Sequence, residues 1–411
     1  MEEWKEYKLG DVCTIVGRIG FRGYTTDDLT NNPKDGAITL SPTNIVAGEL
    51  DLSKPTYIKW PKYYESPEIM LEKDDIVIVK TGSSIGRTTR IREIKHPMTL
   101  NPQFVVLKDI KVDNVFLSYI IKSPLFQASL KAITVGSAIP TLSQKNLAKI
   151  SINIPEEKTQ KRISRVLSSL DDKIEVNRRI NDNLEQQAQA LFKSWFVDFE
   201  PFKDQPFIDS ELGMIPQGWR VESLSSIADY VNGLAMQKYR PEDGEEGLPV
   251  LKIKELGQGN IDDSSELCSP SVIDEKYIIN DGDIIFSWSG TLMVKVWCGG
   301  KCGLNQHLFV VNPKDYPKWL VYHWTKYHLD NFIRIAKDKA VTMGHIKRGE
   351  LDKAKTIIPD KENMQKIDAL IKPIFEQIIA NEQESRRLAE LRDTLLPRLI
   401  SGELNVSEIK I

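Results

Sequence analysis

Residues 158–198 read KTQKRISRVLSSLDDKIEVNRRINDNLEQQAQALFKSWFVD. Apolar and amide side chains recur in this stretch every seven residues, and a second series follows the first by four residues. The stretch contains no Pro or Gly, and its other positions are mostly charged or amide side chains. This spacing predicts one long helix with a buried seam, about 60 Å long at ~1.5 Å per residue. The two series are Ile163, Leu170, Asn177, Leu184 and Leu191, and Leu167, Ile174, Asn181, Ala188 and Trp195.

The same spacing recurs 204 residues further along the chain, where Asn381 takes the place of Asn177. A polar side chain at one seam position fixes the register of paired helices at some cost in stability. We therefore expect the two helices to pair with each other, antiparallel, with Asn177 facing Asn381. The alternative is two amphipathic helices, each buried in its own domain. In the second helix, the residues that repeat every seven positions are Ile367, Ile374, Asn381, Leu388 and Leu395, and the companion series contains Ile371, Ile378 and Leu399.

The segments that precede the two helices also match one another, in the same order. Repeats of this kind indicate that one structural unit occurs twice. The chain is therefore interpreted as an internal duplication. The matched segments are WKEYKLGDV (4–12) with WRVESLSSI (219–227), KDDIVIVKTGSS (73–84) with DGDIIFSWSGT (281–291), and AIPTLSQKNLAKISINIP (138–155) with TMGHIKRGELDKAKTIIP (342–359).

Each repeat is predicted to be a compact mixed domain followed by one long helix. Val- and Ile-rich runs at 76–79, 104–107 and 149–154 predict strands, and the segments 115–130 and 319–336 predict helices. The expected fold class is α+β: two tandem mixed α/β domains joined by two long antiparallel coiled-coil helices, with a pseudo-twofold internal repeat. The predicted bounds are 1–155 for the first domain, 156–199 for its helix, 200–218 for a linker, 219–359 for the second domain, 360–401 for its helix and 402–411 for a C-terminal tail that leaves the helix at Gly402.

Composition narrows the class of protein. A chain of 411 residues is long enough for two globular domains and additional helix. It has no run of eighteen apolar residues, no signal-peptide pattern and only four scattered cysteines, so we expect a cytoplasmic protein without disulfides. The net charge of -3 does not by itself indicate nucleic-acid binding, but such binding needs only a local basic face.

The loop after the strand at 76–79 is the first candidate binding surface. Between Ile76 and Lys108 there are six basic residues and one acid. Glycine permits close backbone approach and guanidinium offers a planar donor fork, so this composition suits phosphate oxygens and guanine edges. The alternative is a solvated hairpin with alternating charges. Different side chains at matching positions of the two repeats imply two different targets. The candidates are Lys80, Ser83, Ser84, Arg87, Thr88 and Arg90 and, in the second repeat, Trp288, Ser289, Thr291 and Lys295.

The loops that precede the long helices form the second candidate surface. They read VGSAIPTLSQKN (135–146) and KAVTMGHIKRGE (339–350), and both place small or polar residues beside basic ones. Their equal placement in the two repeats favours contact with DNA or phosphate over simple turns with surface lysines. The candidates in these loops are Lys145, His345, Lys347 and Arg348.

Signatures of an enzyme are scarce. Residues 101–104 read NPQF, close to the Asn-Pro-Pro-aromatic loop with which amino-methyltransferases hold a flipped base. The second proline is missing and the other repeat reads NQHL, so coincidence is the better interpretation. Cys298, Cys302 and His307 do not have zinc-site spacing, and we interpret the thiols as buried side chains. The sequence predicts no catalytic centre, no metal site and no cofactor.

The combination of these motifs resembles the specificity subunit of a type I restriction-modification system, over essentially the whole chain. The resemblance implies two target-recognition domains, each reading one half of a split double-stranded DNA sequence, and paired helices that set the gap and dock two methyltransferase subunits. It also implies that methylation, translocation and cleavage belong to partner methyltransferase and restriction subunits. The motifs are LFKSWFVDFEPF (191–202), SELGMIPQGW (210–219), IPTLSQKNL (139–147), TMGHIKRGEL (342–351) and LRDTLLPRLISGEL (391–404).

Two rival hypotheses differ from this one in class. A stand-alone adenine methyltransferase would bind S-adenosylmethionine, and a coiled-coil adaptor would not contact DNA. If the helices set the gap, the half-site centres should lie about one helical turn apart, roughly 10 bp. The aromatic end of the first helix is the candidate docking site for methyltransferase subunits, with packing against the second domain as the alternative. Its residues are Phe192, Trp195, Phe196 and Phe199.

Overall fold

The computed structural model describes residues 4–46, 48–134, 141–262, 264–338, 345–406 and 409. The chain divides into two compact units, Met1–Asp172 together with Ala389–Ile411, and Lys173–Leu388. Each unit contains a globular part and segments of both long helices. Within the described residues, no helix is long and apolar enough to cross a membrane.

The two long helices are α6 (Glu157–Phe196) and α12 (Lys361–Ile400), each of 40 residues. They confirm the helices predicted from the heptad spacing. The predicted seam is the buried face: Ile163 and Leu167 of α6 and Ile367 of α12 are at most 1% exposed. The outer faces carry the charged side chains, as expected for helices that bury only one stripe.

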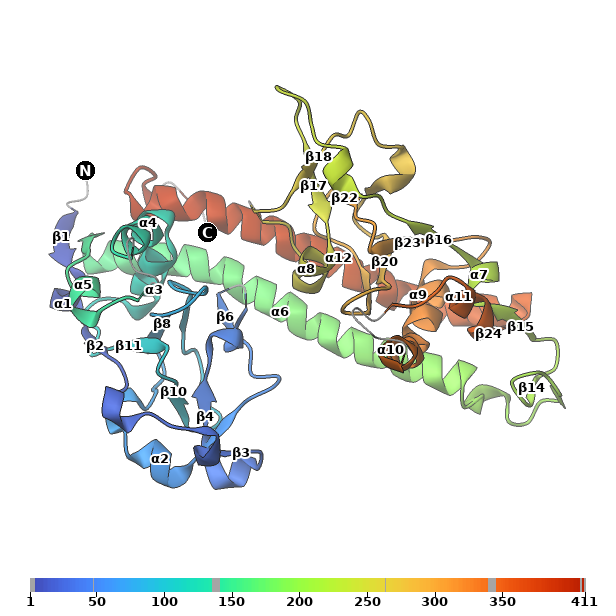
Figure 1. The fold of residues 1–411 in the computed structure, drawn as a ribbon, viewed down its shortest axis with the longest axis horizontal. Coiled ribbons are helices and arrows are strands. Elements are labelled where there is room, and N and C mark those ends of the chain that lie inside the picture. The colour runs from blue at the N-terminus through green and yellow to red at the C-terminus, as the bar shows by residue number, and fades with distance from the viewer. Residues whose placement is uncertain are drawn as a thin grey trace. The chain divides into compact units, whose positions relative to one another are not determined.

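Within each unit α6 and α12 lie side by side and run in opposite directions (Figure 1). In the second unit Lys173 forms an ion pair with Glu384 at 3.2 Å, and the Asn181 amide donates to the Ile378 carbonyl, so numbers rise along α6 as they fall along α12. In the first unit both helices contribute side chains to one apolar core. The predicted pairing is therefore confirmed, and the alternative of two separately buried helices is wrong.

The first unit holds small sheets beside the long helices. Their strand orders are β1-β12, β2-β11-β8-β9 and β10-β4-β7-β3, and β5 pairs with β6. The strands are β1 (Lys5–Lys8), β2 (Thr14–Val16), β3 (Leu29–Thr30), β4 (Gly36–Leu40), β5 (Ile45–Val46), β6 (Glu49–Leu50), β7 (Tyr57–Lys59), β8 (Ile76–Val79), β9 (Thr88–Arg90), β10 (Met98–Leu100), β11 (Phe104–Lys108) and β12 (Ser151–Ile154). The short helices are α1 (Leu9–Val12), α2 (Trp60–Tyr64), α3 (Asn114–Lys122), α4 (Pro124–Ala132) and α5 (Gln144–Leu147).

The second unit repeats this arrangement. The pair β15-β24 corresponds to β1-β12, the sheet β16-β23-β20-β21 to β2-β11-β8-β9, and the parallel pair β17-β22 to β4-β10. The internal duplication is therefore confirmed. The strands are β13 (Phe207–Ile208), β14 (Ile215–Pro216), β15 (Arg220–Ser223), β16 (Ala228–Asn232), β17 (Leu248–Leu251), β18 (Leu267–Cys268), β19 (Ile278–Ile279), β20 (Ile284–Ser287), β21 (Met293–Val296), β22 (Cys302–Leu304), β23 (Leu308–Pro313) and β24 (Lys355–Ile358). The short helices are α7 (Leu224–Ile227), α8 (Ile253–Gln258), α9 (Lys318–Tyr327), α10 (Leu329–Asp338) and α11 (Gly349–Lys353).

A matched turn leads into the central strand of each unit, β8 or β20. Asp75 accepts a hydrogen bond from the backbone N–H three residues earlier at 2.8 Å, and Asp283 does the same at 2.9 Å. The residue before each aspartate has a left-handed backbone, Asp74 with φ 73° and Gly282 with φ 91°. Gly adopts this conformation freely and Asp tolerates it better than most residues, which explains the sequences DD and GD.

Each segment predicted as one helix after the sheets is instead two helices. Between α3 and α4, the side chain of Ser123 accepts from the backbone N–H of Phe126, and Pro124 occupies the first helical position. The ring of proline disfavours a helical residue before it, so one helix ends there and the next begins. In the second unit the break between α9 and α10 falls at His328, whose Nε2 lies 2.8 Å from the Lys355 carbonyl.

The segments after the long helices pack against globular parts. Residues 200–218 include the hairpin β13-β14, and Phe202 and Ile215 are buried in the core of the second unit. At the C-terminus, Gly402 has φ 75°, and Val406 is buried in the core of the first unit. Left-handed glycine is the common way to end a helix, so the chain leaves α12 there and folds back.

Candidate nucleic-acid interface

Three segments meet at the end of the central strand in the first unit. They are the loop after β8, the turn between β10 and β11, and the residues before α5. Lys80 donates its backbone N–H to the Gln103 carbonyl at 2.7 Å, and its own carbonyl accepts from Leu142 at 2.8 Å. Thr81 and Thr141 form an isolated bridge beside these bonds. We call this meeting point the first strand-end junction.

The second unit has the equivalent junction after β20. The Trp288 carbonyl accepts from the backbone of Ile346 at 3.2 Å, and Ser289 and His345 form the isolated bridge. Trp288 thus occupies the place of Lys80. We call this the second strand-end junction. The repeated geometry brings together the two loops of each repeat that were predicted separately as candidate surfaces. Residues 135–140 and 339–344 of those loops lie outside the described residues.

Asn101 and Asn305 stabilise the turn that contributes to each junction. Both are less than 10% exposed. The side-chain oxygen of Asn101 accepts from the backbone N–H of Gln103 at 2.9 Å, and that of Asn305 accepts from His307 at 3.2 Å. A side chain that bonds its own backbone two residues on is a typical turn feature. Residues of the NPQF motif therefore form this turn.

Lys80 is the half-buried cation of the first junction. Its ammonium has no hydrogen bond or ion pair to any of the described residues, and burial lowers the pKa of Lys80. Arg87 and Ser83 are exposed in the same loop, and Ser84 is half-buried. Gly82 and Gly86 have φ 90° and 85°, which fixes the tight course of the loop around them.

Thr88, Arg90, Lys295 and Arg348 are among the predicted contact residues whose side chains already have partners in the fold. Thr88 is buried and donates to the Val77 carbonyl, which argues against its prediction as a DNA contact. The cause is the strand β9, which turns this side chain inward. The other three are cations that bond acceptors within the protein. They are not buried, but these bonds make them weaker candidates for contact with DNA. These are Arg90 on Asp74, Lys295 on the Gly257 carbonyl and Arg348 on the Tyr230 carbonyl.

Trp288 presents a ring fixed from several sides. Its Nε1 donates to Asn232 at 2.9 Å, and its ring lies 5.7 Å from that of Phe309 and 6.3 Å from that of His345. Ser289 is buried, with its hydroxyl 3.0 Å from His307 Nδ1. The second junction is therefore aromatic where the first is cationic. Thr291, His345, Lys145 and Lys347 are exposed beside the two junctions.

The aromatic end of α6 packs into the core of the second unit, which argues against its prediction as a docking site. Phe196 is fully buried and Phe192 is 5% exposed, while Trp195 and Phe199 pack partly buried on the same core. The rings of Phe196 and Trp324 lie 5.8 Å apart. The stated alternative, packing against the second domain, is the observed arrangement.

The seam asparagines form crossed hydrogen bonds in the second unit. The Asn177 amide donates to the Ser385 hydroxyl at 3.3 Å and to the backbone carbonyl of Asn381 at 3.4 Å. The Asn381 amide donates to the side chain of Asn181 at 2.8 Å. Asn177 therefore meets Asn381 through its backbone, and each asparagine amide bonds a side chain one turn further along the other helix.

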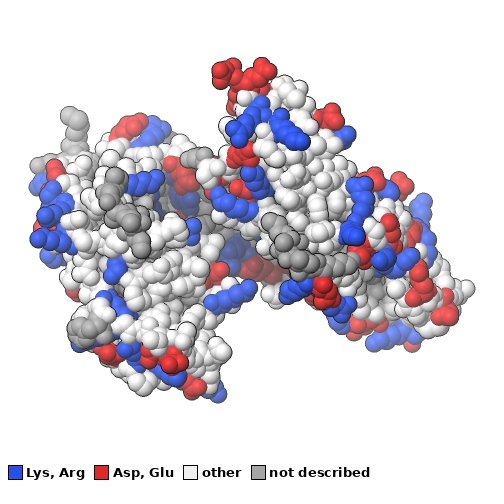
Figure 2. All heavy atoms as spheres, in the orientation of Figure 1, with Lys and Arg blue, Asp and Glu red and all other residues white. Residues whose placement is uncertain are grey.

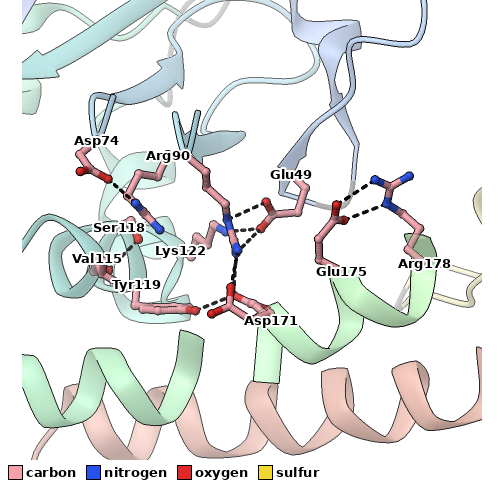
Figure 3. A network of polar contacts seen from close by, with 12 residues as sticks. Glu49, Asp74, Arg90, Val115, Ser118, Tyr119, Lys122, Asp171, Glu175 and Arg178 are labelled. Atoms are coloured by element: carbon pink, nitrogen blue, oxygen red, sulfur yellow. Dashed lines mark hydrogen bonds and ion pairs between the residues drawn. The ribbon is translucent and has the colours of Figure 1, made fainter. Parts of the chain in front are cut away.

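A charged anchor that the sequence did not reveal ties the first globular part to the long helices. The carboxylate of Asp171 is 5% exposed and accepts from Arg392 at 2.7 Å and from the Tyr119 hydroxyl at 2.5 Å. Figure 3 shows Tyr119 from α3, Glu49 from β6 and Asp171 from α6 converging. Burial alone would raise the pKa of Asp171, but Arg392 and the Tyr119 hydroxyl hold that pKa below its usual value.

The second unit has a related anchor. Tyr322 on α9 and Lys326 both bond the carboxylate of Glu185 on α6, at 3.2 and 2.7 Å. Beside them His323 is 4% exposed and stacks on Phe192, and burial lowers its pKa to about 4. A signal for both anchors exists in the sequence, since Asp171 and Glu185 are acids next to seam positions.

The structure also shows where the surface charges, the cysteines and the possible metal ligands lie. On the visible face of Figure 2, Lys and Arg are interspersed with Asp and Glu, without one broad basic area. Cys13, Cys268 and Cys302 are free and buried, and burial raises the pKa of Cys268 to about 11. Among the described residues, no three His, Cys, Asp or Glu side chains are grouped as metal ligands.

Comparison with known proteins decides the family. Residues 1–186 and 216–391 match the family described as the type I restriction modification DNA specificity domain. The chain belongs to this family. The specificity subunit of the type I restriction enzyme MjaIX of Methanocaldococcus jannaschii is 32% identical over 329 residues, which cover 77% of this chain and 75% of that protein. The HindI specificity subunit of Haemophilus influenzae is 23% identical over 478 residues, covering 98% of this chain and all of that protein.

A solved structure supports the fold of this specificity subunit. The crystal structure of the S subunit of a type I restriction-modification system from M. genitalium has a TM-score of 0.52 and covers 97% of this chain and 96% of its own, at 15% identity. The resemblance and fold class predicted from the sequence motifs are confirmed. Membership of this family implies a non-catalytic role.

Proposed function

We propose that this specificity subunit reads a bipartite DNA sequence, one half with each of its two units. The observation that carries the proposal is the repeated strand-end junction, which keeps the hydrogen bond to the carbonyl of Lys80 or Trp288 and the isolated bridge but changes its side chains. DNA offers the same phosphate backbone to both units but a different pattern of base edges in each half-site. A repeated scaffold with altered side chains suits that task.

The exposed cations beside the junctions are proposed to bind phosphates. Arg87, Lys145 and Lys347 are exposed in the loops that form the junctions. Lysine and arginine contacts to phosphate position a protein on the duplex and release counterions, and each contact removed should lower the slope of log affinity against log salt by about one.

Methylation and cleavage are proposed to come from partner subunits. The relatives are named as specificity subunits of restriction enzymes, and Asn101 is engaged in its own turn. Two methyltransferase subunits would add adenine methylation, and restriction subunits would add translocation and cleavage. The paired helices are the proposed platform for them and the proposed ruler between half-sites.

The deciding experiment maps methylated adenines in DNA from cells that express this chain with its methyltransferase partner. We expect two short specific sequences separated by a fixed gap of unspecified bases. Methylation that does not require this chain, or a target without a gap, would refute the proposal. A titration of the isolated chain with S-adenosylmethionine tests the stand-alone enzyme, which predicts binding.

A second experiment distinguishes a DNA reader from an adaptor. Replacing Arg87, Lys145 and Lys347 together by alanine should weaken DNA binding of the full complex and reduce its salt slope by up to about three. The control replaces Lys54, Lys203 and Lys301, three exposed lysines outside the junctions and the long helices. An adaptor predicts unchanged DNA affinity for both variants.

A further inference from the structure

Lys80 and Trp288 occupy one position of the duplicated scaffold. Lys80 directly follows the pair Val79–Phe104 of β8 and β11, and Trp288 directly follows Ser287–Leu308 of β20 and β23. Each residue gives its carbonyl to the segment before the next short helix, and the following residue forms the isolated bridge. The two side chains therefore start from the same place in the two units.

Their hydrogen-bonding capacities are opposite. The Lys80 ammonium offers three donors, is half-buried, and has no acceptor among the described residues. The donor of Trp288 is already used on Asn232, so the rest of the ring can offer only apolar contact. A partly desolvated cation without an acceptor is unfavourable until a ligand supplies one.

The difference between the repeats separates base contact from phosphate contact. Both units meet the same phosphate backbone, so a position that binds phosphate should keep a donor in both repeats. A position that changes from a donor to an apolar ring fits base edges, which differ between half-sites. This step rests on the proposed function, because it assumes that each unit reads one half-site.

We infer that Lys80 and Trp288 are specificity-determining residues, one for each half-site. Lys80 is assigned to a guanine, which presents the O6 and N7 acceptors side by side in the major groove. Trp288 is assigned to a thymine, whose methyl group is the apolar feature of that groove. The backbone bonds on both sides of Lys80 hold it in place, as reading a base edge requires.

The test uses the full chain with its methyltransferase partner and a DNA library randomised across the target. Lys80→Met keeps the length of the side chain and removes its donors. It should lower discrimination at one guanine of one half-site by about 5- to 150-fold, the range of a single base contact, with the other half-site and the gap unchanged. Trp288→Gln should change preference at one thymine of the other half-site only.

Two controls make the outcome specific. Lys73→Met removes an exposed lysine at the opposite end of β8 and should leave every preference unchanged. Lys80→Arg keeps a donor and should retain the preference for guanine. The melting temperature of Lys80→Met should equal or exceed that of the parent, because Lys80 has no partner among the described residues to lose and its partly desolvated charge is removed.

The results separate this inference from the proposed function. If Lys80→Met weakens methylation equally at all sequences, Lys80 binds phosphate and the inference is overturned. Unchanged preferences in both variants would also overturn it, although the bipartite target of the parent protein would stand. A parent protein without a bipartite target would instead refute the proposed function.

Discussion

Asp171 is the residue on which the charged groups of the first unit converge. Its carboxylate is buried between Arg392 of α12 and Tyr119 of α3, with an Arg92 nitrogen 3.8 Å away. Its neighbour Asp172 is 63% exposed and bonds only Arg92 among the described residues, at 2.7 Å. Substituting each of these adjacent acids therefore compares the effect of a buried charge with that of an exposed charge on the same helix.

Asp171→Asn should destabilise the first unit. The substitution removes the buried charge that Arg392 and Tyr119 bond, and breaking a buried pair costs about 3 to 5 kcal/mol. Arg392 is 24% exposed and keeps Asp393 at 2.8 Å, so the cost should fall near the lower end of this range. Asp172→Asn, the matched control, should cost about 0 to 1 kcal/mol, because exposed pairs contribute little. Urea denaturation of both variants measures the difference. Equal costs for the two substitutions would show that Asp171 does not anchor the unit.

The same carboxylate makes stability depend on acid pH. The folded pKa of Asp171 lies below its unfolded value, so the contribution is present above the unfolded pKa of about 3.9 and is lost as pH falls through the folded pKa. Asp171→Asn should therefore flatten the loss of stability below about pH 4. Urea midpoints for parent and variant between pH 2 and pH 5 test this, and parallel curves would contradict it.

His323 should make the stability of the second unit depend on pH in a higher range than Asp171 does for the first unit. Burial lowers its folded pKa to about 4, whereas the unfolded value is about 6.5. The unfolded chain then binds the proton first, so stability is full above about pH 6.5 and falls between there and about pH 4. His323→Gln should reduce this loss in calorimetric melting without abolishing it, because burial also lowers the pKa of His328. Substitution of the exposed His345 by Gln serves as the control. A loss of the same size in His323→Gln and the parent would refute the assignment.

At the scale of elements, the sequence predicted the features that depend on residues close together in the chain. The heptad series identified α6 and α12, and the repeated motifs identified the duplication, because both signals lie within short stretches of sequence. The sequence left two alternatives for Phe192 and Phe196, docking or packing, because the residues that cover them, such as Trp219 and Trp324, belong to other segments. Likewise, Lys80 and Arg90 look alike in sequence, but within the described part of the chain only Arg90 meets an acid, Asp74.

The seam asparagines should specify the pairing of α6 with α12. Asn177→Leu with Asn381→Leu adds apolar contact and removes a buried side-chain oxygen of Asn177 that has no partner among the described residues. We expect a melting temperature equal to or above that of the parent, but a less unique register, because amides in a seam bond in one alignment only.

Cross-linking measures this loss of register. Cysteines replacing Lys173 and Glu384, which form an ion pair in the native register, should cross-link in one product in the parent and less completely in the double variant. Asn183→Leu, which changes an exposed amide outside the seam, should behave like the parent. If the double leucine variant keeps both its melting temperature and its single product, the asparagines do not set register.

At the scale of the whole molecule, the proposed function makes the paired helices a ruler between half-sites. Adding one heptad at facing positions of α6 and α12 would lengthen the pair by about 10 Å, at ~1.5 Å per residue. One base pair advances about 3.4 Å along the duplex, so the gap in the target should grow by about three base pairs.

Methylated-adenine mapping of the lengthened protein, expressed with its methyltransferase partner, measures the gap directly. The half-site sequences should stay the same, because the strand-end junctions are untouched, and only their separation should change. A heptad added to α6 alone would misalign the seam, leaving Asn181 without Asn381 and the apolar positions out of step, so it should abolish methylation rather than shift the gap. An unchanged gap in the doubly lengthened protein would mean that contacts other than the helices, such as those of the methyltransferase subunits, fix the separation of the half-sites.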